Sequence, residues 1–358
     1  MMKLPRLNRP ALILAALLAF HPGFQSTATA AQHITTPTDG FRNTELADLK
    51  PHASASKTYN EIWTYHFFLD GNIQAYLNFS RVNLGSFKDP VCGADLTLLG
   101  FKGRNYSVAR EYEKRNFTFT DSNSELRVHE KIWFDGKLPE AHHVHFATSK
   151  KDVNYVLDLK FSDIEPGKVW GDGMFHFGSS DAIGIFIHIP SAKVSGTVAI
   201  NGDTLHVTGR AYMDHTFQTD MAPDLVSGGF RYISQTDPME VGYLLNPVTK
   251  FESKPVGYGL RKTEAGWSLL KPASMRAVTW TKPMGVRVPG ILEIKYQDDS
   301  KSVIQRGEDR LQQSTLHEFS GFSKMAIKSF MGGEIYTFKG MGNLNGRQPT
   351  AYNYFSVD

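Results

Sequence analysis

The chain has 358 residues, of which 41% are hydrophobic and 12% aromatic, enough to bury a sizeable core. Three of its 39 basic residues and none of its 36 acidic residues lie in the first 31 positions, which leaves 36 of each sign in the remainder. This balance and the lack of a Lys/Arg cluster argue against a nucleic-acid partner. The single cysteine, Cys92, excludes an intramolecular disulfide and a cysteine-based metal cluster.

The N-terminal segment predicts export. Lys3, Arg6 and Arg9 precede an apolar run at residues 11–20, and residues 28–30 (Ala-Thr-Ala) form a small-residue cleavage pattern. The run is shorter than the roughly 18 apolar residues that a membrane span needs, and no later segment reaches that length. We therefore expect residues 1–31 to be a signal peptide and the mature chain to be secreted, or periplasmic in a bacterium, without stable membrane insertion.

Residues 32–57 are polar and rich in Thr, Ser, Ala and Pro, which predicts a flexible lead-in. From residue 58 onward, short alternating runs separated by Gly, Asn, Asp and Pro predict one strand after another. Trp63, Tyr65 and Phe67 alternate with polar residues up to a turn at residues 70–71, and the pattern then reverses over residues 73–79 as in a hairpin. Similar runs follow at residues 125–134, 142–147, 153–161, 182–189, 228–234 and 241–245.

The segment from residue 194 to residue 215 predicts a second hairpin. Asn201-Gly202 suits a tight turn because both residues accept positive φ. The returning strand places Leu205, Val207 and Met213 on one face and Arg210, Tyr212 and Asp214 on the other. The strand end therefore carries a phenol, a carboxylate and, at His215, an imidazole.

The second half continues with expected strands at residues 267–270, 277–280, 290–296, 334–340 and 351–356. Phe319, Phe322, Ala326 and Phe330 are spaced like one face of a helix that Gly332-Gly333 would end. These patterns predict an all-β fold of antiparallel barrels, since closing a barrel removes exposed edges. We expect an N-terminal domain at residues 58–260 and a C-terminal domain with one short helix at residues 261–358.

Common catalytic signatures are missing from the sequence: it has no Gly-x-Ser-x-Gly elbow, zinc-binding His-Glu-x-x-His helix or phosphate-binding loop. His143 and His145 would share one face of a strand and could reach one metal ion, but no nearby carboxylate is an obvious third ligand. A solvated strand face is the expected alternative. We therefore expect neither a metal nor a cofactor.

Residues 209–215 (Gly-Arg-Ala-Tyr-Met-Asp-His) resemble the Gly-x-Gly/Ala-Tyr-x-Asp-His element of the AttH and carotenoid 1,2-hydratase family. Residues 173–178 and 221–232 keep the order and approximate spacing of that family and of the Svf1-like proteins. The resemblance implies two tandem lipocalin-like antiparallel β-barrels that handle hydrophobic molecules. In the hydratases an isoprenoid double bond is protonated, and the residue that matches the candidate proton donor is Asp214, with Tyr212 and His215 beside it.

Chemistry allows two alternative roles for Asp214, a proton donor or a polar latch. A proton donor to an alkene has to be a buried carboxyl in an apolar cavity. The alternative is a polar latch between the barrels, in which Asp214 pairs with Arg210 or caps the turn at residues 216–220. On a regular strand Asp214 and His215 project to opposite faces, so they share a site only at a bulge or strand end.

The function expected first is therefore the binding of a hydrophobic small molecule, a lipid or an isoprenoid. The expected ligand-contacting aromatic residues are Trp63, Tyr65, Phe67, Phe175, Phe177 and Tyr212, and core filling is the alternative for them. The second expectation is a cofactor-independent hydratase, isomerase or cyclase that uses acid catalysis from Asp214. The third is a structural factor of the cell envelope with a filled barrel.

Overall fold

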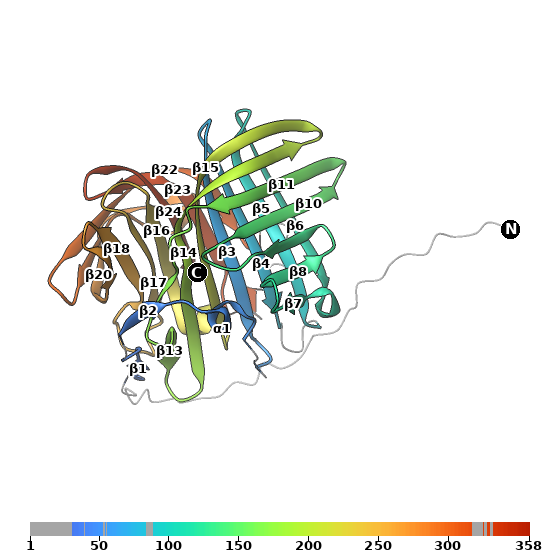
Figure 1. Ribbon diagram of the computed structural model, residues 1–358. Helices are drawn as coiled ribbons and strands as arrows, with labels where there is room; N and C mark the ends of the chain where they lie inside the picture. The colour runs from blue at the N-terminus through green and yellow to red at the C-terminus, as the bar shows by residue number, and fades with distance from the viewer. Residues whose placement is uncertain are drawn as a thin grey trace. The chain divides into compact units, whose positions relative to one another are not determined.

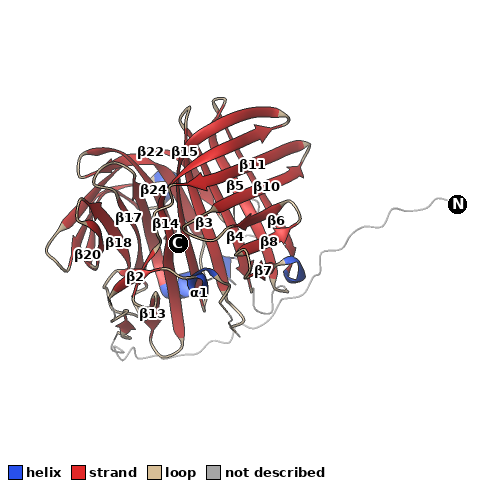
Figure 2. Cartoon of the chain, viewed as in Figure 1, coloured by secondary structure: helices blue, strands red, loops and turns tan. Residues whose placement is uncertain are grey.

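The structure is a computed structural model that describes residues 31–358 except 39, 53, 55, 84–88, 317–324, 326, 327, 330 and 331. Residues Gln32–Asp358 form one compact unit, and its strands make two antiparallel sheets (Figure 1). Helices are few and short (Figure 2). The predicted all-β fold with two tandem lipocalin-like barrels is confirmed. No helix in the described part of the chain has the length and hydropathy to cross a membrane.

The first sheet is built mainly from hairpin-connected neighbours. Its strand order is β6-β5-β4-β3-β15-β14-β11-β10-β9-β8-β7, and β5 also contacts β8, which brings the two ends of the sheet together. The strands are β3 (Asn60–Leu69), β4 (Ile73–Val82), β5 (Val91–Phe101), β6 (Arg104–Glu113), β7 (Thr118–Thr120), β8 (Glu125–His129), β9 (Ile132–Asp135), β10 (His142–Lys150), β11 (Val153–Ser162), β14 (Asp181–Ile200) and β15 (Asp203–Gln218).

The second sheet has the order β19-β18-β17-β16-β24-β23-β22-β21-β20, and β18 contacts β20 across the ring. Its strands are β16 (Val226–Ser234), β17 (Glu240–Pro247), β18 (Val256–Thr263), β19 (Gly266–Leu270), β20 (Pro272–Thr281), β21 (Val288–Tyr296), β22 (Lys301–Ser314), β23 (Ile335–Leu344) and β24 (Arg347–Val357). The short helices are α1 (Leu46–Leu49), α2 (Ala222–Leu225), and the 3-10 turns η1 (Lys114–Asn116) and η2 (Pro283–Gly285).

The change of sheet corrects the predicted domain boundary. The chain leaves the first sheet at Gln218 and enters the second at Val226, whereas the boundary predicted at residues 260/261 falls inside β18. Alternating runs look the same on both sides of residue 220, and only strand pairing distinguishes the two barrels.

The predicted flexible lead-in is also corrected. Residues 32–57 contain β1 (Ile34–Thr35), which pairs with β13 (Met174–Phe177), and β2 (Phe41–Asn43), which pairs with β12 (Lys168–Trp170). Leu49 of α1 is buried in the first core. Backbone pairing and this apolar contact compensate for the polar composition that suggested disorder.

Two other predictions fall on residues that are not described. The predicted signal peptide lies outside the described residues, apart from Ala31. The predicted helix at residues 319–330 lies mostly outside them as well, and its described residues, Met325, Lys328 and Ser329, are helical.

The predicted hairpin between β14 and β15 is confirmed. Asn201 and Gly202 have φ values of 52° and 84°, so both turn residues take the left-handed conformation. Val207 and Met213 of β15 lie in the core of the first barrel, whereas Tyr212 lies in a cluster shared with strands of both sheets. The two faces of β15 therefore serve different parts of the molecule.

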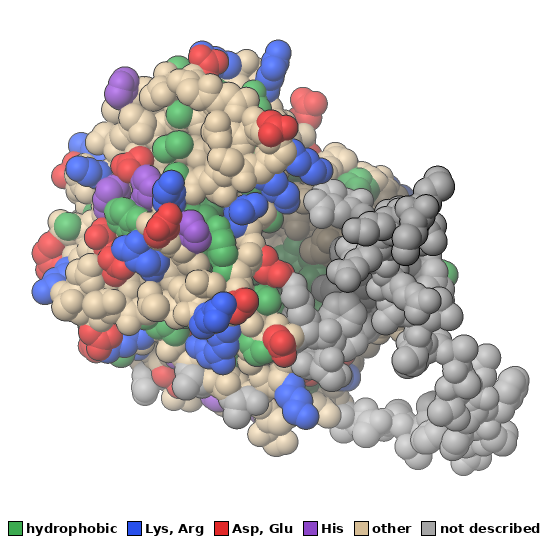
Figure 3. Space-filling model, turned by 90° about the vertical axis from the view of Figure 1, so that its right-hand side faces the viewer, with side chains coloured by type: hydrophobic (Ala, Val, Ile, Leu, Met, Phe, Trp, Pro, Cys, Tyr) green, Lys and Arg blue, Asp and Glu red, His purple; other side chains and the backbone are tan. Residues whose placement is uncertain are grey.

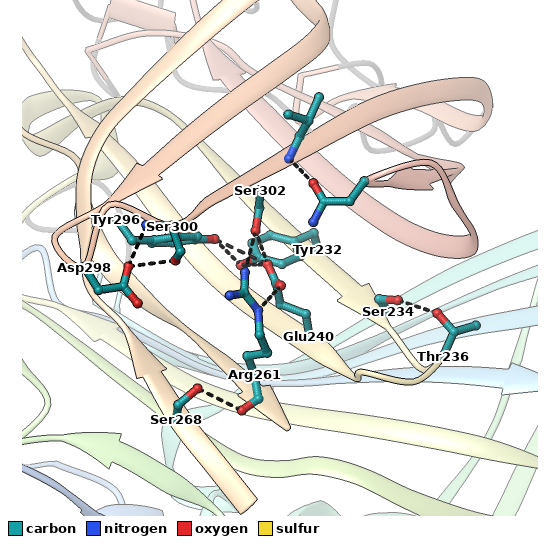
Figure 4. A network of polar contacts seen from close by, with 12 residues as sticks. Tyr232, Ser234, Thr236, Glu240, Arg261, Ser268, Tyr296, Asp298, Ser300 and Ser302 are labelled. Atoms are coloured by element: carbon teal, nitrogen blue, oxygen red, sulfur yellow. Dashed lines mark hydrogen bonds and ion pairs between the residues drawn. The ribbon is translucent and has the colours of Figure 1, made fainter. Parts of the chain in front are cut away.

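The interior of the second barrel holds a buried polar network around Glu240 (Figure 4). The Glu240 carboxylate accepts hydrogen bonds from Arg261 Nε at 2.8 Å, from Tyr232 at 3.1 Å and from Tyr296 at 3.4 Å, and it also accepts one from Ser302. These hydrogen bonds and the charge of Arg261 offset the free-energy cost of burying the carboxylate. The network therefore fills and orders the second barrel.

We predict that Gly209→Ala lowers the free energy of unfolding by about 1–3 kcal/mol, because the new methyl group would overpack a tight site. A Cβ at Gly209 would lie 2.1 Å from the Phe68 carbonyl oxygen on β3, which pairs with β15. Urea denaturation measures the change. Gly40→Ala is the control, since a Cβ there has nothing within 4 Å, and equal stability losses in the two variants would contradict the prediction.

Candidate functional site

Asp214 and His215, neighbours on β15, point to opposite sides of the first sheet. Asp214 is fully buried against Arg231 of the second sheet. His215 packs inside the first barrel, with its ring stacked on Trp63 at 4.3 Å between centroids. The alternation predicted from the strand pattern is therefore confirmed, and the two residues do not share one site.

Asp214 forms a bidentate ion pair with Arg231. Arg231 Nε lies 2.5 Å from Asp214 Oδ2, and its second nitrogen lies 2.9 Å from Oδ1. Burial alone would lower the pKa of Arg231, but the charge of Asp214 raises it above its ordinary value. Both oxygens of Asp214 accept hydrogen bonds from the guanidinium, as in a bidentate ion pair, and not in the arrangement expected of a proton donor facing a cavity.

The inter-barrel latch has a different partner from the one predicted. Arg210 donates to Ser191 Oγ at 3.3 Å instead of pairing with Asp214. Arg210 and Asp214 share a face of the strand about 13 Å apart, and each has another partner. Tyr212 is buried beside the pair, and burial together with the charge of Asp214 raises the pKa of Tyr212 well above its ordinary value.

Asp214 begins a polar row across the outer face of the first sheet. It pairs in register with Thr64 on β3, Thr64 pairs with Asn78 on β4, and Asn78 pairs with Asp95 on β5. Directly opposed residues of antiparallel strands lie on the same face. Asn78 Nδ2 donates to both oxygens of Asp95, at 3.0 and 3.2 Å, which holds the Asp95 carboxyl in this row.

A matching polar row crosses the outer face of the second sheet. Arg231 on β16 pairs in register with Tyr243 on β17 and with Asn353 on β24, and Asn353 pairs with Lys339 on β23. The Arg231 guanidinium carbon lies 4.1 Å from the Tyr243 ring centroid, and Lys339 Nζ lies 4.2 Å from the ring centroid of Tyr76 on the first sheet. These stacking contacts position both cations.

The two rows line one cavity of about 370 Å³, which we call the inter-sheet cleft. Asp214 is covered by Arg231 and does not line it. The polar lining from the two rows comprises Thr64, Asn78, Asp95, Arg231, Tyr243, Lys339 and Asn353, and the apolar lining includes Ile62, Val82, Ile335 and Phe355. The cleft therefore offers both apolar surface and several converging polar groups, as small-molecule sites do.

Asp95 and Lys339 have opposite pKa shifts in this cleft. Burial raises the pKa of Asp95, although Lys339 and Asn78 partly oppose the shift. Burial lowers the pKa of Lys339 to about 8, although Asp95 partly opposes it. A carboxyl and an ammonium group whose pKa values are shifted towards each other are candidates for proton transfer near neutral pH.

The aromatic residues expected to contact a ligand lie in packed cores. Trp63, Tyr65 and Phe67 belong to the core of the first barrel. Phe175 and Phe177 belong, with Tyr212, to the cluster shared by strands of both sheets. These positions agree with core filling, the alternative considered for them.

His143 and His145 share a face of β10, as expected, and both contact Asp158 of the neighbouring strand. The distances from their ring nitrogens to the Asp158 oxygens are 2.9 and 2.7 Å. The face in Figure 3 shows basic and acidic side chains interspersed with histidines, in keeping with the balanced charge of residues 32–358.

No sequence motif pointed to Asp95 or Lys339. Each is a polar residue in a strand whose neighbours belong to a barrel core, Ala94 and Leu96 for Asp95 and Phe338 for Lys339. That pattern also describes an ordinary solvent-facing position. Asp95 could have been found only from the cross-strand register, which places it in one row with Asp214.

No protein-family model and no curated protein matches this chain. Solved structures match its fold. A Nitrosomonas europaea protein assigned as AttH gives a TM-score of 0.61 at 12% identity, over 90% of this chain and 99% of that one. CghA with Sch210972 gives 0.54 at 13% identity, over 84% and 89%. Kievitone hydratase from Nectria haematococca gives 0.50 at 12% identity, over 90% and 95%. The chain therefore has the AttH-like tandem-barrel fold that its motifs predicted.

We predict that Asp214→Ala lowers the free energy of unfolding by about 3–5 kcal/mol, because it leaves the Arg231 charge buried without its partner. Thermal and urea unfolding measure the loss. The control is Glu113→Ala, which removes an ion pair to Arg115 whose side chains are 70% and 80% exposed. That variant should keep the wild-type midpoint. An Asp214→Ala midpoint equal to that of the control would contradict the latch.

Proposed function

We propose that the protein is a proton-transfer enzyme of the hydratase, isomerase or cyclase type. Its substrate is a hydrophobic small molecule with an oxygen function, bound in the inter-sheet cleft. The observation that carries this proposal is the presence of Asp95 and Lys339, with opposed pKa shifts, in one cavity of about 370 Å³. Asp95 carries the proton and Lys339 binds the oxygen.

The charges of the cleft favour a reaction in which negative charge develops. Once Asp95 has taken up a proton while Lys339 stays protonated, the cleft has an excess of positive charge, because Asp214 balances Arg231. Fixed positive charge in a partly buried site stabilises an oxyanion and destabilises a carbocation. The cleft therefore suits a reaction that forms an enolate or phenolate oxyanion. It suits less well the alkene protonation by Asp214 that the sequence led us to expect.

Hydration of a conjugated carbonyl illustrates the roles. The Asp95 carboxylate takes a proton from water while the water oxygen bonds to the β carbon, and the electron pair of the double bond moves to the carbonyl oxygen. The Lys339 ammonium stabilises this enolate. Asp95 then returns the proton to the α carbon and the carbonyl reforms, so that one water is added and Asp95 is regenerated. Isomerisation uses the same two residues without water.

The substrate class is supported by the lining of the cleft and by the structural relatives. Ile62, Ile335 and Phe355 provide apolar contact, and the polar rows provide orientation. One relative is by name a hydratase of kievitone, and another was solved with Sch210972. We further propose that the enzyme works after export and removal of the signal peptide.

We predict that Asp95→Asn lowers kcat by about 10²–10⁴-fold, the usual contribution of a general acid–base group, and leaves binding intact. Kievitone and a panel of hydrophobic conjugated ketones serve as substrates. Mass spectrometry in deuterated water detects added water and carbon-bound deuterium. Asp163→Asn is the exposed control and should keep full activity. Saturable binding without turnover by the wild type would instead favour a carrier.

The pKa of Lys339 can be tested without a substrate. We predict that Lys339 titrates near pH 8 in the folded protein, followed by NMR of isotope-labelled lysine side chains. Asp95→Asn should lower this pKa further, because it removes the negative charge that favours the ammonium form. Activity that requires the ammonium should fall as the pH rises through about 8. An unchanged Lys339 titration in Asp95→Asn would show that the two groups are not coupled.

A further inference from the structure

A second group of polar residues lies inside the first barrel, on the face of β15 opposite the inter-sheet cleft. It comprises His52, from the segment before β3, Glu61 of β3 and His215 of β15, and we call it the His-Glu cluster. One potential ligand atom from each lies within 4.8 Å of the others. Glu61 and His215 are fully buried, and the His52 side chain is 28% exposed.

We propose that the His-Glu cluster binds one divalent transition-metal ion of the Zn²⁺ class. This site goes beyond the proposed function, because no step at Asp95 or Lys339 uses it. Two imidazoles and one carboxylate are a ligand set typical of Zn²⁺, and imidazole nitrogen favours transition metals over Mg²⁺ and Ca²⁺.

The distances in the cluster suit a shared ion. Glu61 Oε1 lies 3.0 Å from His215 Nε2 and 3.2 Å from His52 Nδ1. Ligand atoms about 2.0–2.1 Å from one tetrahedral zinc lie about 3.3 Å from each other. Small side-chain movements are therefore enough to place these three atoms around one ion.

The surroundings of His215 fix the orientation of its ring. His215 Nδ1 lies 2.9 Å from the Asp48 carbonyl oxygen, which can only accept, so Nδ1 carries a hydrogen. The ring also stacks on Trp63. An imidazole held through one nitrogen in this way presents the other nitrogen to a metal, as in many zinc sites. Nε2 of His215 is the nitrogen directed at Glu61.

His188, which has one ring nitrogen without a hydrogen-bond partner among the described residues, and a cavity lie next to the cluster. The ring of His188 lies 5.9 Å from that of His215, and its Nε2 is buried without a hydrogen-bond partner among the described residues. His188 lines a cavity of about 490 Å³ together with Leu46 and Leu49. None of the three cluster residues lines this cavity, so His188 is the residue that lies between the cavity and the cluster. A zinc ion with three protein ligands takes a water or a substrate atom as its fourth ligand.

The competing explanation is a metal-free ion pair. In that state His215 carries hydrogens on both nitrogens and donates to Glu61, and the cluster only stabilises the barrel. Both states bring the same three residues close together. A direct measurement of metal binding therefore distinguishes them.

The test is zinc titration of the full-length chain after removal of bound metal with a chelator. Calorimetry with a competing chelator at fixed pH measures affinity and stoichiometry, and the visible spectrum with Co²⁺ reports the coordination geometry. We expect one Zn²⁺ per chain and no binding of Mg²⁺. His52→Ala and Glu61→Gln should each weaken zinc binding by more than about 10-fold, the lower limit seen when even an outer partner of a metal ligand is removed.

His143→Ala is the matched control. It removes a histidine that contacts Asp158 on the outside of the barrel and does not belong to the His-Glu cluster. It should bind zinc like the wild type. His52 is partly exposed, so its variant tests the site even if Glu61→Gln fails to fold. The proposal is overturned if the wild type binds no stoichiometric zinc, if His52→Ala binds normally, or if His143→Ala loses the binding.

Discussion

The arrangement of the two barrels depends on the buried ion pair between Asp214 and Arg231. It joins the central strand β15 of the first sheet to β16 of the second. Asp214 is fully buried, and the Arg231 side chain is 8% exposed where it lines the inter-sheet cleft. A buried pair of this kind adds little net stability compared with an apolar contact, but losing one partner is costly. We expect the pair, together with the apolar cluster shared by the two sheets, to favour the docking that keeps the two charges in contact. In that docking the two polar rows lie together.

The inter-sheet cleft follows from that docking. Asp95 and Lys339 lie on separate sheets, on strands far apart in the chain, and each would face solvent if its barrel stood alone. When the barrels pack, both become partly or fully buried, and burial shifts the pKa of Asp95 up and that of Lys339 down. The proposed chemistry is thus a property of the interface between the barrels.

The period of a β-strand separates two kinds of site on β15. In the last part of β15, Tyr212 and Asp214 face the second sheet, whereas Met213 and His215 face the interior of the first barrel. A reaction in the cleft and a metal at the His-Glu cluster are therefore separated by the thickness of one sheet. The adjacent Asp-His pair, which looks like one site in the sequence, belongs to two.

The sequence by itself determined the all-β class, the Asn201-Gly202 hairpin and the alternation of β15, because these depend on local turn preferences and on a period of two residues. It did not determine the change of sheet after Gln218 or the packing of residues 32–57, because alternating patterns do not specify pairing partners. Only the tertiary structure decided that Asp214 pairs with Arg231, that Asp95 and Lys339 line the same cleft and that Glu61 contacts His215. Each of these arrangements joins residues distant in the chain, and long-range packing brings them together.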